Sequence, residues 1–475
     1  MSTAALTPDL CVIGAGAGGL SVAAAATALG APVVLIEQGR MGGDCLNYGC
    51  VPSKALIAAA RRVAVLRDTP AFGVTAEAAR IDFAKVRAHV HGTIATIGAN
   101  DSAARFTALG VRVIAGHAEF RDPKTVVVGE TTIAARRFVI AAGSSPAVPP
   151  IPGLRETPYL TNETIFDLTT LPEHLVVIGA GPVGLELAQA FRRFGSAVTV
   201  IDAAIPLAKN DPECVAPVLS ALEREGIMLR PNSRIAQVSG NAHAVRLTLD
   251  GAGAGEPVEG SHLLVAAGRT PNIANLGLDR AEIAVTRHGI TVDRQLRTTN
   301  ARVYAIGDVA GGPQFTHLAN YHAGIVIRQA LFRLPVRASD AALPWVTYTD
   351  PELAQVGLTE AEARQRGLRV RLLRWPYHEN DRAQIEQATR GHIKVLTTGR
   401  GRILGASIVG RDAGELISTF TLAITQRLNI RALAGVMVPY PTLAEIGKRA
   451  AMGHFTPGLT RPMVRRIIGW LRRLG

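Results

Sequence analysis

Two cysteines with four residues between them, Cys45 and Cys50, are the residues of this chain whose type and spacing most directly suggest chemistry. They lie in GGDCLNYGCVPSK, where Pro52 suits the first turn of a helix because its missing N–H has no partner there. Cys50 would then lie at a helix N-terminus, where backbone N–H groups and the helix dipole favour a thiolate. This setting is typical of a redox-active or nucleophilic cysteine. A zinc site is the main alternative, but it needs two more ligands, and no second Cys or His pair lies nearby.

A glycine-rich turn before the cysteines predicts a nucleotide site. It follows an apolar strand at residues 10–13 and carries Gly14, Gly16 and Gly19 in the pattern G-x-G-x-x-G. An alanine-rich helix follows, and the next strand ends at Glu37. In such a βαβ unit the glycines allow a tight turn, the helix N-terminus takes a pyrophosphate and the acid takes a ribose.

The same unit recurs further along the chain. Gly179, Gly181 and Gly184 follow a strand at 175–178, and Asp202 closes the next strand. Two such units predict two nucleotide domains, with one flavin and one nicotinamide as the economical pairing. An acid at this position accepts hydrogen bonds from the ribose 2′-OH and repels a 2′-phosphate. We therefore expect NADH to be preferred to NADPH.

The stretch at 42–54 resembles the signature of the class I flavoprotein disulfide reductases, GG-x-C-x-N-x-G-C-x-P-[ST]-K, at every fixed position. Glutathione reductase, dihydrolipoyl dehydrogenase and mercuric reductase are members of that family. The resemblance extends over about residues 8–455. It implies an α/β fold with two Rossmann-like dinucleotide-binding domains, for FAD and NAD(P), and a C-terminal α+β dimerisation domain. The expected parts are a first FAD-binding segment at 1–150, an NAD(P)-binding domain at 151–270, a return segment of the FAD domain at 271–335, the dimerisation domain at 336–456 and a basic amphipathic tail at 457–475.

The resemblance also implies a route for electrons, from NAD(P)H to FAD, then to a Cys45–Cys50 disulfide and on to a low-mass acceptor. Cys50 would be the thiolate nearer the flavin, and Cys45 the thiol that attacks the acceptor. Lys54 matches the family lysine near the flavin, and Glu186 matches its ion-pair partner. No residues are assigned to a resident metal.

The segment 303–308 resembles the second FAD motif of the family, in which Asp308 would bind the ribitol. A helix around 317–328 would then point its N-terminus at the flavin. We expect His317 and His322, at its start, to pack beside the cofactor rather than act as bases. The further cofactor contacts that the resemblance implies are Gly43, Lys54, Ala118, Gly143, Gly268 and Ala319.

One stretch departs from glutathione reductase and dihydrolipoyl dehydrogenase. Those enzymes carry His-Pro-Thr-x-x-Glu near the C-terminus, and the His of the partner subunit is their acid–base catalyst. Here the run at 440–445 is YPTLAE, with Tyr440 in place of the His and Glu445 retained. A phenol with a pKa near 10 is a poor base at neutral pH, which disfavours disulfide or dihydrolipoamide substrates that need this base.

Mercuric reductase also has Tyr at this place, and its metal is held by thiolates. Two of its features are missing from this sequence, an N-terminal metal-binding Cys module and a C-terminal Cys pair. We therefore expect a homodimeric, mercuric reductase-like enzyme that reduces a thiol-reactive metal ion, a small disulfide or another low-mass acceptor. A dihydrolipoyl dehydrogenase is the second hypothesis. A membrane-docked electron donor or redox sensor for a partner protein is the third.

Composition indicates a folded protein of a reducing compartment. With 475 residues, 48% hydrophobic and 19% charged, the chain has the size of about three domains. Four cysteines give no disulfide framework, which favours a cytoplasmic location and a catalytic role for any Cys45–Cys50 bond. The net charge of +13 is not accompanied by stacking aromatics, so no nucleic-acid partner is expected. Neither a signal peptide nor a transmembrane helix is expected.

The last stretch, RPMVRRIIGWLRRLG from Arg461, lies outside the resemblance. Pro462 suits a helix start, and one face of the helix would carry Val464, Ile467, Ile468, Leu471 and Leu474. Arginines occupy the rest of the surface, and a short basic helix with Trp and Leu is typical of an interfacial membrane anchor. Peripheral contact with the inner face of a membrane is thus one prediction. The alternatives are a helix that packs its apolar face on the dimer and a tail disordered in solution.

Overall fold

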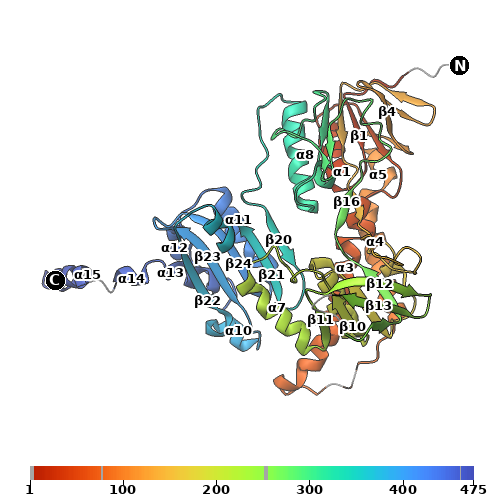
Figure 1. Ribbon diagram of the computed structural model, residues 1–475. Coiled ribbons are helices and arrows are strands. Elements are labelled where there is room, and N and C mark those ends of the chain that lie inside the picture. Colours follow the sequence, from red (N-terminus) through yellow and green to blue (C-terminus); the bar gives the residue numbers. More distant parts are fainter. Residues whose placement is uncertain (1–4, 76, 78, 251–254, 460–461, 475) are drawn as a thin grey trace. The chain divides into compact units, whose positions relative to one another are not determined.

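A computed structural model describes residues 5–75, 77, 79–250, 255–459 and 462–474 (Figure 1). The chain forms two compact units. The first comprises residues 1–179, 190–201 and 234–339, and the second comprises 180–189, 202–233 and 340–475. Among the described residues, no helix is both long enough and apolar enough to cross a membrane.

The first unit is built on a five-stranded parallel sheet, which carries the first glycine-rich turn. Helices α1 (Ala17–Ala28) and α8 (Thr316–Ala330) lie side by side in this unit (Figure 1). Because hydrophobic cores cover both faces of the sheet, its inner strands β1 and β2 are almost entirely apolar. The strands, in order across the sheet, are β19 (Val303–Ala305), β7 (Arg137–Ile140), β1 (Leu10–Ile13), β2 (Val33–Glu37) and β3 (Arg112–Ala115).

Strand β1 divides its side chains between two cores, as the alternation of a strand requires. Leu10 and Val12 join the cluster formed with α1 and α8. Cys11 and Ile13 join a second cluster, which includes Phe120 of β4 (Glu119–Asp122). Cys11 is therefore a small buried core residue, and burial raises the pKa of its thiol. This agrees with its predicted place in an apolar strand.

The second glycine-rich turn follows β9 (His174–Ile178), which lies between the parallel strands β10 (Ala197–Ile201) and β15 (His262–Val265). Helix α6 (Pro182–Phe194) connects β9 to β10. An antiparallel sheet of β12 (Arg234–Gly240), β13 (Val245–Asp250) and β14 (Val258–Gly260) shares a hydrophobic core with β9 and β15. Strand β8 (Ser144–Pro146) pairs with β16 (Arg269–Pro271).

The other elements of the first unit are short or peripheral. They are α2 (Gly43–Asn47), α3 (Cys50–Asp68), η1 (Thr69–Phe72), α4 (Phe83–Gly98), η2 (Ala99–Asp101), α5 (Ala103–Ala108), β5 (Thr125–Val128), β6 (Thr131–Ile133), η3 (Ile165–Asp167), β17 (Val285–Thr286), β18 (Gly289–Ile290) and η5 (Gly307–Ala310).

The second unit contains an antiparallel five-stranded sheet, packed against α11 (Ala413–Thr425) and α13 (Glu445–Met452) in one hydrophobic core. The strands, in order, are β20 (Pro344–Thr347), β21 (Glu352–Gly357), β24 (Ile403–Gly410), β23 (His392–Thr398) and β22 (Val370–Pro376). Its other elements are α7 (Pro212–Arg224), β11 (Ile227–Arg230), α9 (Glu360–Gln365), η6 (Tyr377–Glu379), α10 (Asp381–Ile385), α12 (Ile430–Gly435), α14 (Thr456–Leu459) and α15 (Pro462–Leu471).

Candidate active site

The cysteine pair lies where the short helix α2 is followed by the longer helix α3. Cys45 is in the middle of α2, and Cys50 is the first residue of α3. Both are free thiols, with Cys50 exposed and Cys45 half-buried. The Ser53 hydroxyl donates to the Gly49 carbonyl at 2.7 Å and so fixes the first turn of α3. The predicted position of Cys50 at a helix N-terminus is confirmed.

The surroundings of the two thiols separate their pKa values. A hydrogen bond from Cys45 lowers the pKa of Cys50 to about 6, and burial only partly opposes this effect. Thr316, the first residue of α8, places its Oγ1 3.5 Å from the Cys50 Sγ and also favours the thiolate, as does the charge of Lys54. The same Cys45–Cys50 hydrogen bond, together with burial, raises the pKa of Cys45. At neutral pH the pair therefore holds one thiolate, on Cys50, and one proton, on Cys45.

The first glycine-rich turn has the geometry of a phosphate cradle. Gly14 has a φ of +103°, and a Cβ there would lie 2.4 Å from the Ala141 carbonyl oxygen. A Cβ on Gly43 would lie 2.7 Å from the Gly16 Cα, so the cysteine segment and the turn approach backbone to backbone. No side chain caps α1 at Gly16, and its first turn carries no acid. Its N–H groups therefore suit an anionic pyrophosphate.

The acid of the first unit anchors the turn. The Glu37 carboxylate accepts the Ala15 N–H at 2.6 Å and the Gly39 N–H at 2.7 Å. Glu37, at the end of β2, is thus held against the glycine-rich turn by the hydrogen bond from Ala15. Its role toward a ribose stays a prediction. Gly19 packs closest of the three glycines, since a Cβ there would lie 1.9 Å from the Gly14 carbonyl oxygen.

The second turn repeats this geometry. Gly179 has a φ of +112°, and a Cβ there would lie 2.4 Å from the Ala266 carbonyl oxygen. The Asp202 carboxylate accepts the Ala180 N–H at 2.6 Å, as Glu37 does for Ala15. A Cβ on Gly181 would meet nothing within 4 Å, and Gly184 lies within α6. The predicted recurrence of the βαβ unit is therefore confirmed at the level of single hydrogen bonds.

The second flavin motif also has the predicted local structure. Asp308 lies in η5 and accepts the Ser144 hydroxyl at 2.5 Å, while burial raises its pKa. Ala319 of α8 packs against Gly18 and Gly307, where an added Cβ would lie 3.3 and 3.1 Å from its own Cβ. Gly143 and Gly268 have φ values of +69° and +113°, and Ala118 is buried.

The two histidines that follow this motif contact neighbouring groups, and their packing beside the cofactor stays a prediction. His322 is buried, and its Nδ1 accepts the Gly307 N–H at 3.3 Å. His317 stacks on Phe315, with ring centroids 5.2 Å apart.

Three predicted catalytic positions lie in the second unit. The buried Glu186 carboxylate accepts the Tyr348 N–H at 2.9 Å. Tyr440 is 70% exposed, and its hydroxyl donates to the Asp381 carboxylate at 2.9 Å. Glu445 begins α13. The Lys54–Glu186 ion pair and the roles of Tyr440 and Glu445 stay predictions.

A polar cluster beside the cysteines was missed by the sequence reasoning. Arg269 Nη2 lies 3.1 Å from the Asp44 carboxylate, and Asn162 Nδ2 donates to the same oxygen at 3.2 Å. Arg269 also donates to the Ser144 hydroxyl at 2.7 Å. The one sequence signal was Asp44 itself, a carboxylate at the variable position directly before Cys45.

The sequence matches one family of known proteins over most of its length. Residues 8–323 match the family described as pyridine nucleotide-disulphide oxidoreductase, and residues 343–451 match its dimerisation domain. The chain belongs to this family. The expected fold, with its nucleotide-binding and dimerisation domains, and the predicted family are confirmed. The chain is therefore an oxidoreductase of a family that depends on FAD and a pyridine nucleotide, and the dimerisation domain supports a homodimer.

Relatives of more than one activity resemble this oxidoreductase. A mercuric reductase of Streptomyces lividans is 36% identical over 451 residues, which cover 93% of this chain and 95% of that protein. A dihydrolipoyl dehydrogenase of Geobacillus stearothermophilus is 33% identical over 456 residues, 94% of this chain and 96% of that protein. The Cu(II) complex of the HOCl-induced flavoprotein disulfide reductase RclA from Escherichia coli has a TM-score of 0.83 and 28% identity, and covers 94% of this chain and 99% of that one.

Proposed function

We propose that this oxidoreductase passes electrons from NAD(P)H through FAD to the Cys45–Cys50 disulfide and on to a thiol-reactive metal ion, a small disulfide or another low-mass acceptor. FAD, when bound, supplies the two-electron relay between a nicotinamide hydride and a disulfide. Reduction of the disulfide takes two electrons and one proton, breaks the S–S bond and leaves the proton on Cys45 and a thiolate on Cys50. The observation that carries this proposal is the pair itself, with an exposed Cys50 at the start of α3 whose pKa is lowered to about 6.

One set of residues would hold FAD, and the two thiols have separate roles in the exchange with the acceptor. Gly14, Gly16 and the uncapped start of α1 would hold the FAD pyrophosphate, and Asp308 would take the ribitol. Cys45 attacks a disulfide acceptor, which releases one thiol and forms a mixed disulfide. The Cys50 thiolate then attacks Cys45, re-forms the Cys45–Cys50 bond and releases the second thiol of the acceptor. The pair ends oxidised, and the acceptor has gained two electrons.

The acceptor site favours a metal ion of mercuric reductase type over dihydrolipoamide. Tyr440 stands where the family's acid–base His stands, and its hydrogen bond to Asp381 raises its pKa further from neutrality. A phenol held as a donor cannot take a proton from a thiol substrate. Relatives named mercuric reductase and the Cu(II) complex of RclA support the metal reading. Dihydrolipoyl dehydrogenase is the second candidate because a relative of that name matches over almost its full length.

The test is anaerobic reduction by NADH, followed by a panel of acceptors: mercuric and cupric ions, lipoamide and glutathione disulfide. Cys45→Ser should leave FAD bound and reducible by NADH but abolish transfer to metal or disulfide acceptors. Cys214→Ala, which removes a buried thiol outside the pair, is the control and should retain turnover. Unchanged metal turnover in Cys45→Ser would overturn the mechanism. Lipoamide as the fastest acceptor would favour the dihydrolipoyl dehydrogenase reading.

The nicotinamide preference follows from Asp202. Its carboxylate accepts the Ala180 N–H and thus lies at the turn where a ribose would bind. The carboxylate would repel a 2′-phosphate, so kcat/KM should be higher for NADH than for NADPH. Asp202→Asn removes the charge and should lower the ratio of kcat/KM for NADH to kcat/KM for NADPH. A wild-type enzyme that prefers NADPH would refute the assignment.

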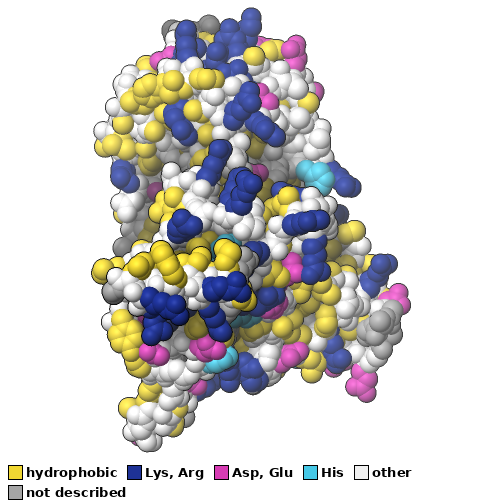
Figure 2. Space-filling model, turned by 90° about the vertical axis from the view of Figure 1, so that its left-hand side faces the viewer, with side chains coloured by type: hydrophobic (Ala, Val, Ile, Leu, Met, Phe, Trp, Pro, Cys, Tyr) yellow, Lys and Arg dark blue, Asp and Glu magenta, His cyan; other side chains and the backbone are white. Residues whose placement is uncertain are grey.

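The C-terminal helix supports a second, peripheral role at a membrane. No residue of α15 is buried, and the apolar stripe of Ile467, Ile468 and Leu471 is exposed. Arginines flank that stripe at 465, 466, 472 and 473, whereas Arg461 lies outside the described residues. Lys and Arg side chains are also spread among hydrophobic ones over the face drawn in Figure 2. We propose that α15 lies in the interface of an anionic bilayer, where each Arg contributes about 1 kcal/mol.

Co-sedimentation with anionic and with neutral vesicles tests this role. The full chain should bind anionic vesicles more strongly than neutral ones, and a chain ending at Leu459 should bind neither. Ile467→Asp should weaken binding by placing a charge in the apolar stripe, whereas the control Met463→Leu should not. Equal and negligible binding by the full and shortened chains would end the membrane proposal.

A further inference from the structure

A cluster of four polar side chains joins the segment between the two cysteines to the flavin motif. Asp44 Oδ1 forms an ion pair with Arg269 Nη2 at 3.1 Å and accepts a hydrogen bond from Asn162 Nδ2 at 3.2 Å. Asn162 Nδ2 also donates to the Tyr48 carbonyl at 3.1 Å, within the loop that separates Cys45 from Cys50. Arg269 also donates two hydrogen bonds to Ser144, from Nε to the hydroxyl at 2.7 Å and from Nη2 to the carbonyl at 2.6 Å.

The Asp44 carboxylate reaches both cysteines through their chain neighbours. It belongs to the residue directly before Cys45, and its Oδ1 faces Arg269 and Asn162. Its Oδ2 faces Gly49, the residue directly before Cys50, because a Cβ on Gly49 would lie 2.9 Å from this oxygen. Asp44 therefore links the two ends of the loop, and glycine at 49 leaves the room for it.

Arg269 is the cation shared by two carboxylates. Its Nε lies 3.9 Å from the Asp308 Oδ2, its Nη2 lies 3.1 Å from the Asp44 Oδ1, and its side chain is 21% exposed. Without the guanidinium, the charge of Asp44 would oppose a thiolate on Cys50, since like charges disfavour each other at short range. Asp308 would also lose its cation.

We propose that Arg269 and Asn162 are positioning residues for the dithiol. Both bind Asp44 and so hold the Cys45–Cys50 loop in place, and Arg269 neutralises the carboxylate beside it. This inference rests on the proposed function, which it deepens by naming what tunes the thiol pair. None of these side chains needs to touch the acceptor. They act on reactivity through the geometry and charge next to the two sulfur atoms.

The test is a double-mutant cycle on the reduced holoenzyme, with Arg269→Gln, Asp44→Asn and both together. The readouts are the alkylation rate of Cys50 at a fixed pH near 6 and the disulfide fraction at equilibrium with a dithiol buffer. Arg269→Gln should slow alkylation at least about threefold, because an uncompensated carboxylate disfavours the thiolate, and should increase the disulfide fraction. Asp44→Asn should leave the rate equal or raise it. The double variant should return to within about twofold of wild type, because the charge that Arg269 offsets is then gone.

Arg280→Gln is the matched control, since Arg280 pairs with Glu119 elsewhere in the same unit. An alkylation rate for Arg269→Gln equal to that of Arg280→Gln would overturn the proposal. The proposal would also be overturned if Cys50 in the double variant were alkylated as slowly as in Arg269→Gln, since that would show a purely structural role for Arg269. If Arg269→Gln loses FAD or fails to fold, a slower rate in Asp44→Asn alone still refutes the proposal. Neither readout needs an acceptor. The proposed function therefore has its own test, and it fails if the wild-type enzyme turns over no acceptor.

Discussion

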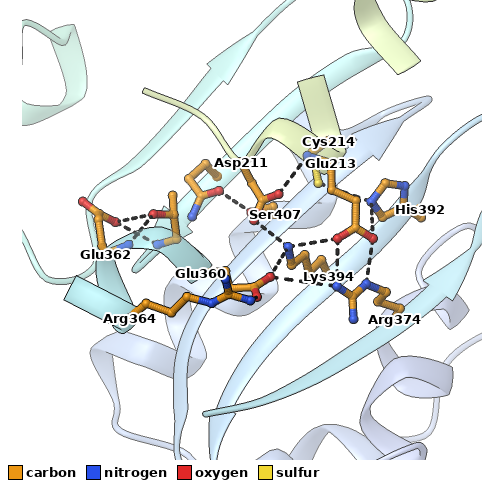
Figure 3. A network of polar contacts seen from close by, with 12 residues as sticks. Asp211, Glu213, Cys214, Glu360, Glu362, Arg364, Arg374, His392, Lys394 and Ser407 are labelled. Atoms are coloured by element: carbon orange, nitrogen blue, oxygen red, sulfur yellow. Dashed lines mark hydrogen bonds and ion pairs between the residues drawn. The ribbon is translucent and has the colours of Figure 1, made fainter. Parts of the chain in front are cut away.

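Replacing the buried Lys394 by Met should cost a large part of the stability of the second unit. Lys394 extends from β23 toward the starts of α7 and α9, where three carboxylates surround it (Figure 3). Its Nζ lies 2.8 Å from Asp211, 2.9 Å from Glu213 and 2.7 Å from Glu360, and its side chain is 3% exposed. Burial opposes the charge, but the hydrogen bonds to the carboxylates outweigh burial and raise the pKa of Lys394.

The magnitude follows from the groups that the substitution leaves behind. Arg374 still binds Glu213 through two hydrogen bonds of 2.6 and 2.8 Å, and Arg364 still pairs with Glu360. Asp211 is also 3% exposed at its side chain, and Lys394 is its one ion-pair partner among the described residues. Removing one partner of a buried pair costs about 3–5 kcal/mol, because the remaining charge stays buried and uncompensated.

Thermal unfolding of the holoenzyme near pH 7, at one protein concentration, measures this loss. For a unit of about 150–250 residues, each kcal/mol corresponds to roughly 2–4 °C, so Tm should fall by roughly 6–20 °C. Lys85→Met is the control, since Lys85 is 86% exposed and lies 3.6 Å from Asp82, a surface pair worth at most about 1 kcal/mol. A Tm for Lys394→Met no lower than that of Lys85→Met would refute the reasoning.

The pH dependence supplies a second check on the same cluster. Hydrogen bonds from Arg374 and then Lys394 lower the pKa of Glu213 to about 2, and Lys394 lowers that of Glu360. A carboxyl with a lowered folded-state pKa contributes stability above its unfolded pKa and loses it as the pH falls. This contribution fades from about pH 4.5 toward about 2. The Tm deficit of Lys394→Met should therefore shrink in acid, and a deficit that grows in acid would contradict the charge argument.

Three further predictions concern the dithiol, the FAD site and Tyr440. Alkylation of Cys50 in the reduced enzyme should rise with pH through a midpoint of about 6 and then level off, and a midpoint near the ordinary thiol value would contradict the thiolate assignment. Gly14→Ala should weaken FAD retention and lower Tm, since its Cβ would meet a carbonyl oxygen at 2.4 Å. Gly30→Ala is the control and should retain FAD, since Gly30 also has a positive φ, of +78°, but its Cβ would meet nothing within 4 Å. Tyr440→His should raise lipoamide or glutathione disulfide turnover by about 10²–10⁴-fold if the missing base is what limits them, and no gain would assign the limit to the pocket.

The parts of the fold that follow local rules could be predicted from the sequence. The strand at 10–13 has the predicted bounds, because an apolar run followed by a glycine-rich turn marks its end. The two glycine turns were also predictable, since only glycine adopts their positive φ so close to a carbonyl. The helix beginning at Pro462 is likewise present. By contrast, the meander of β4, β5 and β6 was not anticipated, because its strands are short and partly polar.

The polar contacts between distant residues could not be predicted. Arg269 meets Asp44 from 225 positions further along the chain, and Asn162 meets it from 118. No local pattern distinguishes these side chains from exposed Arg, Asp and Asn. The Lys394 cluster is similar, since it joins Asp211 of the α7 start to residues of the C-terminal sheet. Such pairings appear only once the tertiary fold brings the elements together.

The opposite pKa shifts of the two thiols bear on the acceptor. Cys45 stays protonated at neutral pH because its proton is shared with the Cys50 thiolate, and burial raises its pKa further. A disulfide acceptor needs a Cys45 thiolate, and the reduced product needs a proton, which an imidazole would normally handle. Tyr440 cannot do so, since its hydrogen bond to Asp381 raises its pKa. A soft metal ion avoids this difficulty because it displaces the thiol proton itself on binding. The pairing of a protonated Cys45 with a phenol at 440 is therefore an argument for our proposal that thiol-reactive metal ions are better acceptors than disulfides.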